Sequence, residues 1–177
     1  MPISWLPRNE GRKPARRDTN EPAEMILRNL IIDRNYCILA ACCVVMIDAL
    51  LVVGAVSHGV LRHIVQTSPL WIAVACAARR SGWCKWAALP CFVFWLLLMT
   101  AIWLFLLGWA QIVSGTFSPT EITMTVLVGI AALVGIVRAL GMKTDVRPLA
   151  AAAAVLSVAA LQVAALRLSL LPQIAHR

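Results

Sequence analysis

Residues 60–78 have the sequence VLRHIVQTSPLWIAVACAA, and whether this segment crosses a membrane decides the fold of the chain. Its length suits a spanning helix, which takes roughly 20 apolar residues. However, it contains Arg62, His63 and Gln66, and Pro69 is a potential kink. Hydropathy therefore leaves a choice between four and five spanning helices.

The stretches on either side are more plainly apolar. Residues 36–56, 89–113, 121–140 and 149–171 are each long and apolar enough to cross a bilayer. The chain of 177 residues is 61% hydrophobic and 14% charged, with a mean hydropathy of +0.83. A soluble domain of this size does not need so much apolar surface for its core. We therefore predict an all-α integral membrane protein built as a helix bundle.

The positions of Lys and Arg favour five spanning helices over four. If residues 60–78 cross the membrane, one side carries all of the 16 Lys and Arg residues except Arg62, Arg167 and Arg177. Cytoplasmic loops are enriched in Lys and Arg, so this side is predicted to be cytoplasmic, together with the N-terminus. With four helices the same rule would be inverted in the loops.

The N-terminal residues 1–35 are predicted to form a hydrophilic cytoplasmic tail, followed by a transmembrane domain over residues 36–177. The tail mixes basic and acidic residues, unlike a secretory signal or a mitochondrial presequence. Within it, residues 21–34 have one apolar side, which predicts an interfacial helix or an ordinary entry segment. The short loops and the charge pattern suit a bacterial inner membrane best, although an organellar or endoplasmic membrane satisfies the same physics.

Asp48 is the main candidate for a functional residue. An acid near the middle of a spanning helix costs at least about 3 kcal/mol unless it is paired or hydrated. From the helical rise, Asp48 and Gln162 lie roughly 18 and 20 Å from the inner ends of their helices, and Gln66 falls at a similar level. We predict one polar layer containing these three residues, with Arg62 and Arg167 nearer its outer rim. The alternative is that the layer only fastens helices together by hydrogen bonds.

The histidines and cysteines give weaker signals. His58 and His63 flank the turn between the first two spans, and His176 is near the C-terminus. A spacing of five at a turn specifies neither a metal site nor a haem site, so His58 and His63 are weak candidate ligands. The six cysteines form no C-x-x-C pair, which excludes the usual dithiol and zinc spacings. We expect no cofactor.

The segments 121–140 and 149–171 are rich in glycine and alanine. Small side chains allow helix backbones to approach closely within a membrane. We therefore predict that these two helices pack on each other.

Three functions are compatible with these observations. The chain contains no G-x-S-x-G, H-E-x-x-H or phosphate-binding glycine loop, so we do not expect an enzyme. Its net charge of +8 indicates attraction to anionic lipid rather than to nucleic acid. The leading hypothesis is an accessory or assembly subunit that packs with other membrane proteins or with itself. The alternatives are a small-solute or proton transporter or channel using the layer around Asp48, and a haem- or metal-binding membrane electron-transfer subunit.

Overall fold

The computed structural model describes residues 21–110 and 117–175, and within these ranges the chain forms helices and no strands. The helices are α1 (Glu21–Val56), α2 (Val60–Ala78), α3 (Cys84–Leu106), α4 (Pro119–Gly141), α5 (Pro148–Ser169) and the short α6 (Pro172–Ala175). The first five are long and apolar enough to cross a membrane, and α2 is one of them. The prediction of an all-α membrane protein with five spanning helices is confirmed.

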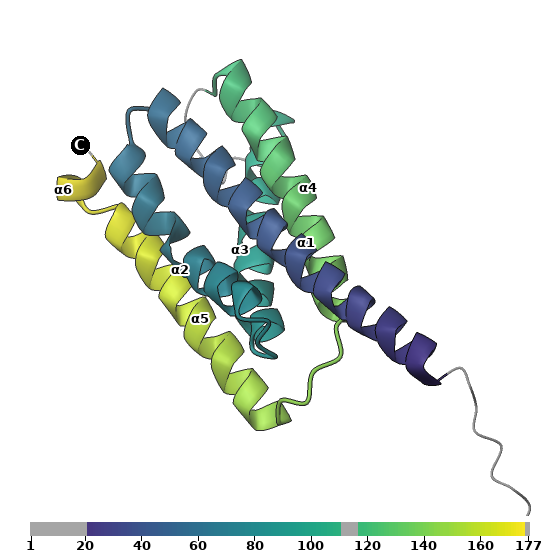
Figure 1. The fold of residues 1–177 in the computed structure, drawn as a ribbon. Coiled ribbons are helices and arrows are strands. Elements are labelled where there is room, and N and C mark those ends of the chain that lie inside the picture. Colours follow the sequence, from purple (N-terminus) through teal and green to yellow (C-terminus); the bar gives the residue numbers. More distant parts are fainter. Residues whose placement is uncertain (1–20, 111–116, 176–177) are drawn as a thin grey trace, which may run out of the picture.

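Successive spanning helices run in opposite directions through the bundle (Figure 1). Helix α1 packs against α2 and α4, whereas α5 packs against α2 and α3. Helix α3 contacts α4, α5 and α2, so it joins the two sides of the bundle. The largest fully buried side chains come mainly from α1, α2 and α3, and include Trp95, Phe92, Leu39, Met46, Ile47 and Leu70.

Helix α1 is longer than the predicted first span. It is continuous over 36 residues, so the segment 21–34 forms the first turns of α1. The part of α1 that is apolar enough to cross a membrane is Asp33–Val56. Residues 1–20 of the predicted tail lie outside the described residues.

Helix α3 occupies residues 84–106 rather than the predicted 89–113, and Gly108 accounts for its earlier end. Gly108 has a φ of +74°, a conformation that glycine adopts without steric strain. The Trp109 N–H then donates to the Leu104 carbonyl at 2.9 Å, and the Gly108 N–H donates to the Phe105 carbonyl at 2.9 Å. These two bonds are the Schellman pattern of a helix C-terminus. The apolar residues after Gly108 misled the prediction, because hydropathy does not report backbone geometry.

Helix α4 begins at a capping box. The Glu121 N–H donates to Ser118 Oγ at 3.3 Å, and the Ser118 N–H donates to Glu121 Oε2 at 2.7 Å. Pro119 occupies the first turn, where its missing N–H costs nothing. These local signals fix the entry of α4 into the bundle.

One end of the bundle gathers most of the basic residues that the structure describes. Arg80 Nη1 in the turn after α2 lies 3.2 Å from Asp33 Oδ1 on α1. At the same end, Lys85 Nζ donates to the Met142 carbonyl beyond α4 at 2.9 Å. We call this the basic end, and its described basic residues are Arg34, Arg79, Arg80, Lys85, Arg138, Lys143 and Arg147.

The prediction that the two small-residue helices pack on each other is wrong. Among the described residues, α4 and α5 make no contact, because each packs on α3 instead. Gly135 of α4 allows a close approach to Phe92 of α3, since a Cβ built on this glycine would lie 2.5 Å from the ring carbon Cε2. On α5, by contrast, most of the alanines are exposed or half-buried.

Candidate functional site

A buried polar cluster joins α2 to α5. Gln66 Nε2 donates to Ser169 Oγ at 2.8 Å, and Gln162 Nε2 donates to the main-chain carbonyl of Gln66 at 3.2 Å. The Ser169 hydroxyl donates in turn to the Leu166 carbonyl of its own helix at 2.7 Å. We call Gln66, Gln162 and Ser169 the α2–α5 seam.

The seam is sealed from its surroundings. Gln162 and Ser169 are 0% exposed and Gln66 is 5% exposed. Gln162 Oε1 is buried without a hydrogen-bond partner among the described residues. Two of the three bonds run between the helices, so the arrangement holds α2 against α5.

Ser169 was missing from the predicted polar layer. It follows Gln162 by seven residues, which is about two helical turns, so the two side chains share one face of α5. This periodicity is the signal in the sequence that could have identified Ser169.

Asp48 does not lie in the seam. It is exposed on the outer face of α1, and α1 makes no contact with α5 within the described residues. In that part of the chain Asp48 forms no ion pair and no side-chain hydrogen bond. The structure therefore brings Gln66 and Gln162 together and leaves Asp48 on the surface of the bundle.

The surface around Asp48 is a continuous stripe along α1. Asp48 is about 12 Å from the end of the helix at Val56, well inside the span. Its neighbours on the stripe are small or β-branched, and all are exposed. We call this stripe the Asp48 face, and its residues are Ala41, Val44, Val45, Asp48, Val52 and Ala55.

Asp48 is unusual among the acids of the described ranges. The others lie at a helix start, at the start of a span or in a loop: Glu21 and Glu24 are in the first turn of α1, Asp33 begins its span, Glu121 caps α4, and Asp145 precedes α5. An acid on an outer face at the depth of Asp48 costs about 3 kcal/mol or more when lipid surrounds it. The Asp48 face therefore carries an electrostatic penalty that contact with a suitable partner would remove.

The two predicted arginines lie toward the end of the bundle opposite the basic end. Arg62 is half-buried near the start of α2, and its Nε is buried without a hydrogen-bond partner in the described part of the chain. Arg167 is exposed in the last turn of α5. Neither of them is paired with Asp48 in the described structure.

His58 and His63, the two described histidines, do not form a ligand cluster. His63 Nδ1 lies 3.0 Å from the Gly59 carbonyl oxygen, so this nitrogen donates a hydrogen bond. His58 is exposed in the turn between α1 and α2, with a φ of +55°. Within residues 21–110 and 117–175 no group of three or more His, Cys, Asp or Glu side chains could hold a metal ion. His176 lies outside those residues.

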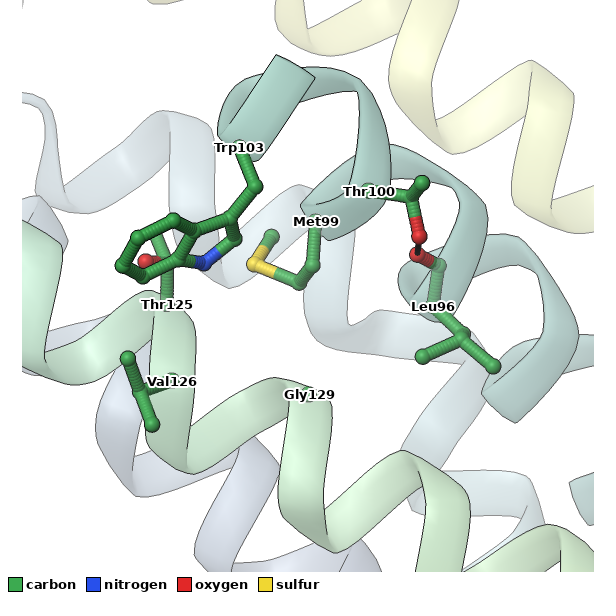
Figure 2. Close-up of a pocket in the computed structure, with 7 residues that line it drawn as sticks. All are labelled: Leu96, Met99, Thr100, Trp103, Thr125, Val126 and Gly129. Atoms are coloured by element: carbon green, nitrogen blue, oxygen red, sulfur yellow. Dashed lines mark hydrogen bonds between the residues drawn. The ribbon is translucent and has the colours of Figure 1, made fainter. Parts of the chain in front are cut away.

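A shallow apolar groove lies between α3 and α4 (Figure 2). The Thr100 hydroxyl donates to the Leu96 carbonyl at 2.8 Å, and the Thr125 hydroxyl donates to the Ile122 carbonyl at 2.7 Å. Both hydroxyl protons are thus used within their own helices, so the groove offers mainly apolar contact. Its lining residues are Leu96, Met99, Thr100, Trp103, Thr125, Val126 and Gly129.

Comparison of the chain with protein-family models, with curated proteins and with solved structures found no match.

Proposed function

We propose that this chain is an accessory or assembly subunit that packs against another membrane protein through the Asp48 face of α1. The observation that carries the proposal is the exposure of Asp48 well inside a spanning helix. A carboxylate in this position is stabilised by a polar or charged group from outside the chain. The small or β-branched side chains beside Asp48 allow a neighbouring helix to come close.

The geometry favours assembly over transport. A path for a solute or a proton would need the polar residues to line one connected space. Asp48 faces outward on α1, whereas Gln66 and Gln162 are used in bonds between α2 and α5. The seam therefore supports a packing role for the two glutamines.

The proposed orientation places the basic end in the cytoplasm. This end holds the basic residues of three separate segments, near Asp33, after α2 and around the α4–α5 loop. An excess of Lys and Arg near the ends of spans favours the cytoplasmic side. A bacterial inner membrane is the proposed location, with anionic lipid against the basic end.

Site-specific photo-crosslinking in the cell's own membranes tests the assembly role. A photoreactive amino acid replaces Val45 or Val52, which lie on either side of Asp48, and the matched control replaces Val163 on α5. All three valines are exposed within spans, at 37%, 39% and 49%. We expect protein adducts from positions 45 and 52 and only lipid adducts from position 163. Lipid adducts alone at all three positions would refute the assembly role.

A further inference from the structure

We infer that the partner at the Asp48 face is a transmembrane helix of another protein, with a Lys or Arg at the depth of Asp48. This inference rests on the proposed function, because it assumes that a membrane protein covers this face.

Charge complementarity is the first argument. A carboxylate inside a membrane is stabilised best by an opposite charge that is removed from lipid at the same time. Asp48 has no such partner among the described residues of its own chain. A cationic side chain on an adjacent helix would compensate the carboxylate and would itself be stabilised by the pairing.

A second copy of this chain is a poorer partner. In a two-fold dimer within one membrane the axis runs along the membrane normal, so the two copies of each residue lie at the same depth. Asp48, in the middle of the face, would then lie near another Asp48. The described basic residues nearest to the spans' outer ends, Arg62 and Arg167, lie within the first or last turn of their helices. Neither is part of the Asp48 face, so that face supplies no cation to a symmetric copy of itself.

The shape of the face is the second argument. From Ala41 to Ala55 the stripe extends over about 21 Å of α1, roughly two thirds of a bilayer core. Val44 and Val45 precede Asp48 by about one turn and Val52 follows it by one turn. A single straight helix lying along this stripe would therefore meet one charge, framed on both sides by small or β-branched side chains.

The experiment uses a defined probe in place of the unidentified partner. A synthetic 24-residue Leu/Ala helix with one central Lys is reconstituted with the full chain in vesicles of zwitterionic lipid. Its association is followed by energy transfer between fluorophores on the peptide and on the chain. The matched probe has Leu in place of the Lys.

We expect the Lys helix to associate about tenfold more tightly than the Leu helix. The preference should persist in Asp48→Glu and disappear in Asp48→Asn, which keeps the shape but removes the charge. Equal association of both helices with the unchanged chain would overturn the inference, as would a preference that persists in Asp48→Asn.

The photo-crosslinking experiment separates this inference from the proposed function. Adducts from positions 45 and 52 that contain only a second copy of this chain would overturn the cationic partner but leave an assembly role standing. Adducts with a different protein that has a Lys or Arg within the crosslinked helix would support both. The absence of any protein adduct would overturn the proposed function itself.

Discussion

Gly135 on α4 and Phe92 on α3 are in direct contact, and the missing side chain of the glycine makes room for the aromatic ring. A Cβ at Gly135 would lie 2.5 Å from Phe92 Cε2 and 2.6 Å from Cζ. Phe92 is fully buried, so its ring has little space into which it could move. This contact sets the distance between α3 and α4.

We therefore expect Gly135→Ala to destabilise the bundle by about 1–3 kcal/mol, as overpacking of a dense core does. The matched control is Gly129→Ala on the same helix, where an added Cβ meets nothing within 4 Å. That change should be neutral, or stabilising by up to about 1 kcal/mol, because alanine favours helices. Unfolding in a mild detergent, followed by tryptophan fluorescence, measures both. Equal stabilities of the two variants would show that the ring is free to move.

The hydrogen bond between Gln66 and Ser169 is predicted to couple α2 to α5. A double-mutant cycle with Gln66→Leu, Ser169→Ala and both changes together isolates the pairwise energy. We expect a coupling of about 0.6 kcal/mol and at most about 1.7 kcal/mol, the range found for hydrogen bonds between helices in membranes. Strictly additive effects would mean that the bond contributes nothing to the packing.

Asp33 and Arg80 form an exposed pair, with side chains 41% and 67% exposed. We expect Arg80→Gln to change the free energy of unfolding by less than about 1 kcal/mol, because water screens such a pair. Thermal unfolding at low and high salt checks this expectation. A larger loss that vanishes in high salt would show that the pair is worth more than its exposure indicates.

The five-span topology predicts which loops share a side of the membrane. A single cysteine at Ser57 should react with an impermeant thiol reagent from one side, and cysteines at Ser81 and Thr144 should react from the other. The control is Cys42, a buried native position that should stay unreactive from both sides until the protein is unfolded. If the cysteines at positions 57 and 81 are labelled from the same side, α2 does not cross the membrane.

The spans could be predicted from the sequence because hydropathy and charge act along the chain. Helix α2 matches the predicted bounds of 60–78, although Arg62, Gln66 and Pro69 made its hydropathy ambiguous. The positive-inside rule resolved the ambiguity, since it depends on the loops and not on the segment itself. The end of α3 at Gly108 was not predicted, because it depends on backbone geometry.

The faces of the helices could not be predicted in the same way. In a membrane both the lipid and the interior of the helix bundle are apolar. A span that is hydrophobic all round therefore does not reveal which of its sides is buried. Depth along α1 predicted a common level for Asp48, Gln66 and Gln162, whereas only the packing shows that Asp48 faces away from the two glutamines. For the same reason, the glycines and alanines of α4 and α5 did not indicate that both helices pack on α3.

The chain taken alone should tolerate the loss of the Asp48 carboxylate. Asp48 makes no ion pair and no side-chain hydrogen bond in the described structure, so Asp48→Asn removes no internal contact and relieves the cost of a carboxylate among detergent tails. We expect the free energy of unfolding of the purified chain to stay unchanged or to rise. Denaturation of the isolated chain in mild detergent measures this change. A large destabilisation would mean that Asp48 has an internal partner.

The most direct measurement is the mass of the complex that the tagged chain forms in its own membranes, determined by native mass spectrometry after gentle extraction. For the unchanged chain we expect a mass that exceeds a single copy by that of a bound membrane protein. Asp48→Leu should reduce the mass to that of one copy, whereas Val163→Leu on α5 should leave the complex intact. A single-copy mass for the unchanged chain would contradict assembly through the Asp48 face, and so would a complex that survives Asp48→Leu.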